Sequence, residues 1–117
     1  MPRLHHVNIT IPAAALAAEE EFLTQVIGLR QVAAPPGSHW FDADGGTQVH
    51  VSLDPRHVPS GTAHIAVNVG GQVPAAERTL AGRGIAYKAI DDGGDTARRR
   101  LFVTDPGGNL WEIRPGG

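Results

Sequence analysis

The stretch HVNITI at residues 6–11 returns as HIAVNV at residues 64–69, and this repetition decides the fold. In both stretches apolar and polar residues alternate, which is the pattern of a β-strand with one apolar and one polar face. Further along, GGTQVHV at residues 45–51 returns as GGNLWEI at residues 107–113. The offset between the copies grows from 58 to 62 residues. We therefore expect an internal duplication whose second copy has a longer loop before its last hairpin.

Each copy continues from its first strand into a helix and then into further strands. Residues 13–27 are rich in Ala and Glu, carry apolar residues at helical spacing, and end at Gly28, which is typical of a helix C-terminus. Pro74 marks the start of a second helix that ends at Gly82 or Gly84. Further strands are expected at residues 40–41, 47–53, 85–90, 101–104 and 109–113, with a loop over residues 91–100.

These elements predict an α+β domain over residues 1–117, built from two tandem βαβββ modules. The first module covers about residues 1–57 and the second about residues 58–117. In every strand the apolar side chains share one face and the polar side chains the other. We expect the apolar faces to pack against helices on the outside, so that the mixed sheet forms a cup with a polar concave face.

Composition excludes several classes of function. A hydrophobic fraction of 41% and a charged fraction of 19% are those of a packed globular protein rather than a disordered one. The net charge of −2 does not predict a nucleic-acid surface. The absence of cysteine excludes disulfides and thiolate metal ligands, so any metal must be held by nitrogen and oxygen. No apolar run approaches the roughly 20 residues that span a membrane, and we expect a cytoplasmic protein.

A metal site is predicted from residues at matching positions of the repeat. His6 and His64 occupy the same place in the two copies, and Glu112 shares the polar face of the last strand. Two imidazoles and one carboxylate form a facial site that leaves coordination positions open for water or substrate, and Zn, Mn, Fe(II), Co and Ni all suit it. His50 is the repeat mate of Glu112, so it is either a fourth ligand or a group that orients the substrate. Glu112 and His50 are also the candidate catalytic residues.

The remaining polar and aromatic residues have simpler interpretations. His5, His39 and His57 are expected to be surface or hydrogen-bonded histidines. Arg98, Arg99 and Arg100 are expected in a solvated loop, from which one of them could reach an anionic substrate. Candidate substrate-binding residues are Asn8, Thr10, Asn68 and Arg100. Aromatic residues expected in the core or in the wall of a cleft are Trp40, Phe41, Phe102 and Trp111, and residues 105–108 are expected to form a turn.

At these residues the sequence resembles the vicinal oxygen chelate superfamily, which includes glyoxalases, bleomycin-resistance proteins and extradiol dioxygenases. The resemblance lies in LHHVNI at residues 4–9, in residues 21–29, in GTAHIAV at residues 61–67 and above all in FVTDPGGNLWEI at residues 102–113. It implies two βαβββ modules around a divalent metal ion, with ligands at the positions of His6, His64 and Glu112. It also implies a homodimer in which ligands could come from two chains.

The resemblance implies a metal-dependent enzyme acting on a small molecule, in which the ion polarises vicinal oxygens of the substrate. The reaction could be that of an isomerase, a lyase, a dioxygenase or a thiol transferase. Members similar to glyoxalase I usually carry Glu at the position of His50, and this departure argues against a lactoylglutathione lyase. The alternative is a metal-free protein that sequesters an antibiotic or another small ligand, as bleomycin-resistance proteins do. A regulatory or degenerate member that binds metal without turnover is a third alternative.

Overall fold

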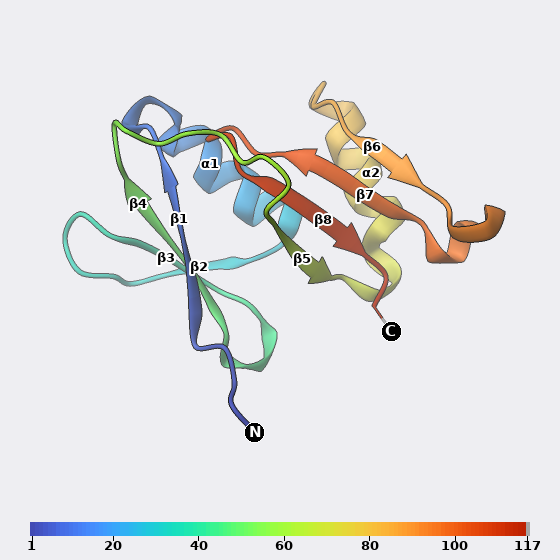
Figure 1. Cartoon of the computed structure of the whole chain (residues 1–117), viewed down its shortest axis with the longest axis horizontal. Coiled ribbons are helices and arrows are strands. Elements are labelled where there is room, and N and C mark those ends of the chain that lie inside the picture. Colours follow the sequence, from blue (N-terminus) through green and yellow to red (C-terminus); the bar gives the residue numbers. More distant parts are fainter. Residues whose placement is uncertain (117) are drawn as a thin grey trace. The chain divides into compact units, whose positions relative to one another are not determined.

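Strand β1 (His6–Ile11) lies parallel to β4 (Gln48–Leu53), with His6 opposite Gln48 and Ile11 opposite Leu53 (Figure 1). β4 pairs antiparallel with β3 (His39–Asp42), and β3 pairs antiparallel with β2 (Arg30–Val32). The first sheet therefore has the strand order β1-β4-β3-β2. A first and a last strand that lie side by side in parallel require the crossover helix that the sequence predicts between them.

The second half repeats this topology. β5 (His64–Asn68) lies parallel to β8 (Leu110–Arg114), and the order β5-β8-β7-β6 is completed by β7 (Arg100–Thr104) and β6 (Lys88–Ile90). The computed structural model describes residues 1–116 and divides into two compact units, Met1–Val58 and the part from Pro59 on. The predicted α+β class and tandem modules are confirmed.

The first helical segment runs over the predicted residues but changes its winding twice. It begins as a 3₁₀ turn (Ala13–Ala15), continues as α1 (Leu16–Glu21) and ends as a π-helical segment (Phe22–Ile27). Gly28 then takes a left-handed conformation with φ 88°, and the N–H of Leu29 donates to the carbonyl of Leu23 at 2.9 Å. A positive φ is costly for residues with a Cβ atom, which explains why glycine ends this segment.

The second helix, α2 (Val73–Gly82), has Pro74 in its first turn as predicted. A 3₁₀ turn (Gly70–Gln72) precedes it, and the left-handed Gly84 follows it with φ 67°. Val73, Ala76 and Leu80 are buried along one side of the helix. This spacing of three and four residues is the apolar stripe of a helix that packs against a sheet.

Several short elements differ from the sequence prediction. β2 was not predicted, because three residues are too short to show an alternating pattern, and it depends on pairing with β3. The strand expected over residues 85–90 is paired only from Lys88 to Ile90. The loop expected over residues 91–100 contains two 3₁₀ turns (Asp92–Gly94 and Thr96–Arg98), and the hairpin before β4 contains a third (Asp44–Gly46). Arg100 is already part of β7.

The turn between β7 and β8 is held by Asp105, which is only 3% exposed. One oxygen of its carboxylate accepts a hydrogen bond from the backbone N–H of Asn109 at 2.8 Å, and the other accepts one from Nε1 of Trp111 at 2.9 Å. Trp111 and Phe41 are fully buried, as predicted for core aromatics. The turn prediction for residues 105–108 is also confirmed, and this turn fixes the start of the strand that carries Glu112.

The buried apolar side chains come from the predicted strand faces and helices. In the first unit they are Ile9, Ile11, Phe22, Leu23, Val26, Ile27, Leu29, Phe41, Val49 and Val51, and in the second Val73, Ala76, Leu80, Leu101, Val103, Trp111 and Ile113. Because apolar residues occupy every second strand position, the other positions carry the polar residues considered next. Among residues 1–116, no helix is long and apolar enough to cross a membrane.

Candidate functional site

His64 and Glu112 meet on the polar face of the second sheet. Ala66 is the register partner of Glu112 across the parallel β5–β8 pair, and His64 lies two residues before Ala66, so both functional side chains project from the same face. Nε2 of His64 lies 3.2 Å from Oε1 of Glu112. The imidazole is 35% exposed and the carboxylate only 6%. The sequence prediction that these two residues share one face is therefore confirmed, and the structure adds their direct contact.

The backbone fixes which nitrogen of His64 carries the proton in a neutral ring. Nδ1 lies 3.0 Å from the carbonyl oxygen of Thr62, and a carbonyl only accepts hydrogen bonds, so Nδ1 must be the donor. Nε2 of the neutral ring then directs a lone pair at the carboxylate of Glu112. Two lone pairs at 3.2 Å repel unless a proton or a cation lies between them. An Nδ1–H bonded to a backbone carbonyl is also the usual arrangement of a histidine that binds metal through Nε2.

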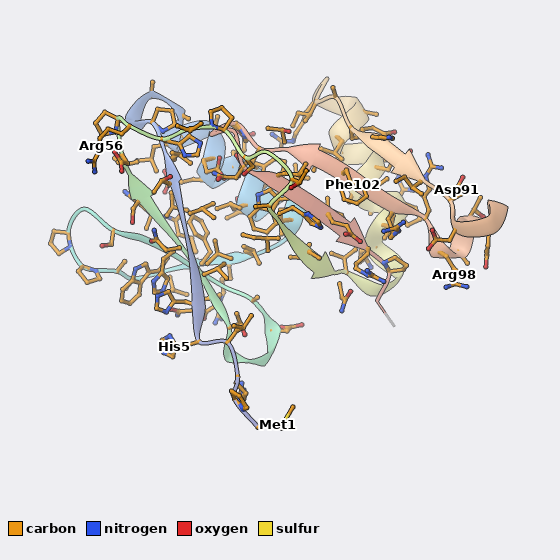
Figure 2. The ribbon with its side chains drawn as sticks, viewed as in Figure 1. Met1, His5, Arg56, Asp91, Arg98 and Phe102 are labelled. Carbon is orange, nitrogen blue, oxygen red and sulfur yellow. The ribbon has the colours of Figure 1, made fainter. Side chains whose placement is uncertain are left out.

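The second oxygen of Glu112 contacts two arginines. Oε2 lies 3.2 Å from Nη1 of Arg114 and 3.4 Å from Nη1 of Arg100. Arg100 also pairs with Asp92 at 3.2 Å. Its guanidinium carbon lies 5.8 Å from the ring centroid of Phe102, a residue that Figure 2 labels. The carboxylate is therefore divided, with Oε2 facing guanidinium groups and Oε1 facing the imidazole.

The interpretation of residues 98–100 as a solvated loop is wrong for two of the three arginines. Arg99 is held between Glu77 on α2, at 2.7 Å, and Asp91, at 3.0 Å. Tyr87 donates a hydrogen bond to the same Glu77 carboxylate at 2.6 Å. A run of three arginines looks solvated in sequence because their acidic partners lie on other elements. Of the three arginines only Arg98 is exposed, and Figure 2 labels it on the loop between β6 and β7.

In the first unit the rings of Trp40, His50 and His6 are stacked in order. The centroids of Trp40 and His50 are 4.4 Å apart with an angle of 9° between planes, and those of His50 and His6 are 4.1 Å apart with an angle of 17°. β1 and β3 flank β4, so the two neighbours cover opposite faces of the His50 ring. Trp40 therefore belongs to the polar face rather than to the core.

His5 continues this cluster at its exposed end. Nδ1 of His5, which Figure 2 labels, lies 2.9 Å from Nδ1 of His6, and the two rings are arranged edge to face. One of the two nitrogens must donate in this contact, unless both bind a shared cation. The interpretation of His5 as an exposed, hydrogen-bonded histidine is confirmed, and its partner is the predicted ligand next to it.

A hydrogen-bonded chain reaches His50 from the edge of the first sheet. Arg30 donates to Asp42 at 3.1 Å, Asp42 accepts from the amide nitrogen of Gln48 at 2.7 Å, and the amide oxygen of Gln48 lies 2.8 Å from Nε2 of His50. The pKa of Asp42 lies below its ordinary value, mainly because Gln48 donates a hydrogen bond to the carboxylate and, to a smaller extent, because Arg30 does. Burial, followed by the charges of His6 and His5, lowers the pKa of His50 and favours its neutral form.

The predicted substrate-binding residues lie in different surroundings. Asn8 accepts a hydrogen bond from Ser52 at 2.9 Å, and Thr10 bonds to Nδ1 of His57 at 2.7 Å, which confirms His57 as a hydrogen-bonded histidine. Asn68 is exposed opposite Arg114 in the β5–β8 register. Sequence reasoning missed the roles of Gln48, Arg114 and Trp40. Gln48 and Arg114 share the parity of His50 and Glu112, so that signal was present for them.

The donor chemistry fits a divalent cation, with two converging donors in the second unit and an imidazole in the first. The second unit supplies Nε2 of His64 and Oε1 of Glu112, and the first supplies the imidazole of His6 beside His50. Within either unit, no group of three or more histidine, aspartate or glutamate residues is gathered as a metal cage in the part of the chain described. Neither unit therefore contains a complete ligand set of its own.

Comparison with known proteins identifies the family. The model of the Glyoxalase/Bleomycin resistance protein/Dioxygenase superfamily matches residues 3–113, and the chain belongs to this superfamily. No curated protein sequence matches the chain closely enough to be counted as a relative.

Solved structures share the fold at low identity. A glyoxalase family protein from Bacillus anthracis is 24% identical, with a TM-score of 0.76 over 97% of this chain and 94% of its own. The fosfomycin resistance protein FosX from Listeria monocytogenes is 15% identical, with a TM-score of 0.81 over 100% of this chain and 95% of its own. A glyoxalase/dioxygenase from Nostoc punctiforme is 18% identical, with a TM-score of 0.78 over 96% and 89%. At these identities the likeness establishes the fold, and activity must be argued from the site.

Proposed function

We propose that this protein is a metal-dependent enzyme of the glyoxalase/dioxygenase type that acts on a small molecule. His64 and Glu112 of the second unit and His6 of the first would hold one divalent ion, drawn from Zn, Ni, Co, Mn and Fe(II). A bound ion would supply Lewis acidity toward two adjacent oxygens of the substrate. A mutant of FosX from Listeria monocytogenes, which shares this fold, has been solved with Mn(II) and 1S,2S-dihydroxypropylphosphonic acid, and this supports the proposal.

The observation that carries the proposal is the orientation of His64. Its Nδ1–H is committed to the carbonyl of Thr62, while Nε2 faces Oε1 of Glu112 at 3.2 Å. His64 and Glu112 would hold a divalent ion, and its positive charge would remove the repulsion between their lone pairs. Arg100 and Arg114 hold the other oxygen of Glu112, which favours binding through a single oxygen.

Residues around the donors have defined tasks in this proposal. Glu112 binds the ion, and the guanidinium of Arg100 beside it would attract an anionic substrate. Asn8, Thr10 and Asn68 would hydrogen-bond polar groups of the substrate from the strand faces on which they lie. His6 would complete the ligand set either from the same chain or from the second chain of a homodimer.

Metal content tests the proposal directly. The protein is purified without an affinity tag, analysed by elemental mass spectrometry, and then stripped and reloaded with each of the five metals. About one equivalent per chain is expected, the content of a three-ligand catalytic site. His64→Ala should abolish retention, whereas His39→Ala, which changes a histidine outside the proposed set, should not. Protein that neither retains nor rebinds any of the metals would refute the proposal.

A metal-free binding protein of the bleomycin-resistance type is the second candidate. It is favoured by the two guanidinium groups on Oε2 of Glu112, which compensate the carboxylate without a metal ion. The two functions differ in their response to a chelator. A sequestering protein would bind its ligand equally well after EDTA treatment, whereas the metal-dependent enzyme would lose both ligand binding and turnover.

A further inference from the structure

The stacking of the His50 ring on His6 determines whether both residues can bind the same metal ion. An imidazole binds a metal in the plane of its ring, because the nitrogen lone pair lies in that plane. The planes of His6 and His50 are stacked 4.1 Å apart between centroids and tilted by only 17°. At the distance from a ring at which a metal ion is bound, this tilt alters the separation of the two planes by only about 1 Å. An ion in the plane of one ring is therefore out of the plane of the other.

The ring of His50 is also prevented from swinging toward such an ion. Trp40 covers its second face at 4.4 Å with an angle of 9°, so that rotation would disrupt two stacked pairs at once. Val49 and Val51, its neighbours along β4, are buried on the opposite face of the sheet and hold the strand in register. His50 is thus confined to a position from which it cannot share the ion of His6.

Gln48 determines which nitrogen of His50 is the acceptor. The carboxylate of Asp42 only accepts hydrogen bonds, so the amide nitrogen of Gln48 must face it, as the 2.7 Å contact shows. The amide oxygen of Gln48 is then the atom that faces Nε2 of His50 at 2.8 Å. An oxygen acceptor requires Nε2 to carry the proton. In the neutral ring the lone pair is consequently on Nδ1.

We infer that His50 is not a metal ligand but a hydrogen-bond acceptor for the bound small molecule through Nδ1, and that Gln48, held by Asp42, is the positioning residue that fixes this tautomer. The role toward a small molecule rests on the proposed function. The tautomer and the absence of ligation are properties of the chain itself, and they are measurable without knowledge of the substrate.

Nitrogen-15 NMR of the histidine rings tests the tautomer in the full-length protein, with the signals of His50 assigned by their loss in His50→Phe. We expect a protonated Nε2 and an unprotonated Nδ1. In Gln48→Lys the side chain can only donate, so the proton of His50 should move to Nδ1. The matched control is Gln31→Lys, which makes the same change at an exposed position of β2 and should leave the tautomer unchanged. If the proton of His50 stays on Nε2 in Gln48→Lys, Gln48 does not fix the tautomer and its positioning role is refuted.

Zinc binding tests the absence of ligation. His50→Phe keeps a flat ring in the stack but removes both nitrogens, and it should change Zn²⁺ affinity by less than about 3-fold. His6→Phe should lower it by more than about 100-fold, above the range seen when a residue that only supports a ligand is lost. A zinc-shifted Nδ1 signal of His50, or an equal loss of affinity in His50→Phe, would overturn the inference. If Zn²⁺ does not bind at all, the proposed function fails, and the tautomer comparison alone decides the inference.

Discussion

Nε2 of His64 lies 3.2 Å from Oε1 of Glu112, although both atoms carry a lone pair when the imidazole is neutral. The equivalent place in the first unit holds His6 against His50, with rings stacked rather than directed at each other. The duplication has therefore produced two polar faces of different chemistry. The second unit offers an imidazole and a carboxylate that face each other, whereas the first offers two imidazoles whose ring planes are nearly parallel.

Loss of either converging donor should abolish metal binding. We expect His64→Gln and Glu112→Gln each to lower Mn²⁺ affinity by more than about 100-fold, since even residues that only orient a ligand contribute 10–100-fold. Competition with a fluorescent chelator measures the affinity. His39→Gln is the control, because His39 lies on β3 and is not a proposed ligand. Retention of wild-type affinity in both site variants would place the metal elsewhere.

The chain that supplies His6 can be identified with mixed variants. His6→Ala and Glu112→Ala are each expected to lose metal binding. If the ligands come from two chains of a homodimer, unfolding and refolding the two variants together should restore about a quarter of the wild-type metal content, because only mixed dimers contain one intact site. If all ligands come from one chain, the mixture stays empty. Elemental analysis of the refolded mixture distinguishes the two arrangements.

Removing a guanidinium from Glu112 should strengthen metal binding. Arg114 lies 3.2 Å from Oε2, and a positive charge so close to the site repels a divalent ion and competes for the carboxylate. Arg114→Gln is therefore expected to raise Mn²⁺ affinity several-fold. Arg78→Gln removes the same charge from an exposed position of α2 and should have little effect. A fall in affinity in Arg114→Gln would mean that this arginine holds Glu112 in its binding orientation.

The ion cluster around Glu77 predicts a pH-dependent contribution to stability. Hydrogen bonds from Arg99, and then from Tyr87, hold the pKa of Glu77 below its ordinary value of 4.5. A lowered pKa stabilises the folded state above the unfolded pKa, and the contribution disappears as the pH falls through the folded pKa. At pH 7, Glu77→Gln should therefore lower Tm by roughly 3–6 °C, which corresponds to about 1 kcal/mol.

The difference in Tm between wild type and Glu77→Gln should narrow once the pH falls below about 4.5. Differential scanning calorimetry over a pH series measures it. Asp44→Asn removes a charge from an exposed turn and should shift Tm little at any pH. A difference that stays constant from neutral to acid pH would show that the carboxylate charge of Glu77 does not stabilise the fold.

Two glycine substitutions should change stability in opposite directions. Gly28 has φ 88° and open space within 4 Å of the position that a Cβ atom would take, so Gly28→Ala meets no clash. The substitution nevertheless forces alanine into a left-handed conformation, which costs about 1 kcal/mol. Gly82 lies in the last turn of α2 without a positive φ and also has open space, so Gly82→Ala should stabilise by about 0.4–1 kcal/mol. Urea unfolding of both variants measures whether each substitution raises or lowers the free energy of unfolding. If both substitutions changed the free energy of unfolding by the same amount, the backbone conformation of the two glycines would not be the cause.

Much of the fold was predictable because a strand with one buried face alternates apolar and polar residues along the sequence. The alternation over residues 6–11 and 64–69 gave both first strands, and Gly28 gave the end of the first helical segment. β2 was not predicted, since a three-residue strand carries no period and depends on pairing with β3. The strand expected over residues 85–90 exists as β6, but it is shorter than predicted because only Lys88–Ile90 pairs with β7. The π-helical winding of residues 22–27 has no signature in the residue types either.

The sequence by itself determined the duplicated α+β architecture and the polar strand faces that carry His6, His50, His64 and Glu112, because side-chain alternation follows from backbone geometry alone. Only the tertiary structure decided what each polar group contacts. The carbonyl of Thr62 orients His64, and the amide of Gln48 orients His50. Arg100 and Arg114 divide the carboxylate of Glu112. Hydrogen-bond direction and ring stacking depend on distances between strands, and those distances exist only once the sheet has formed.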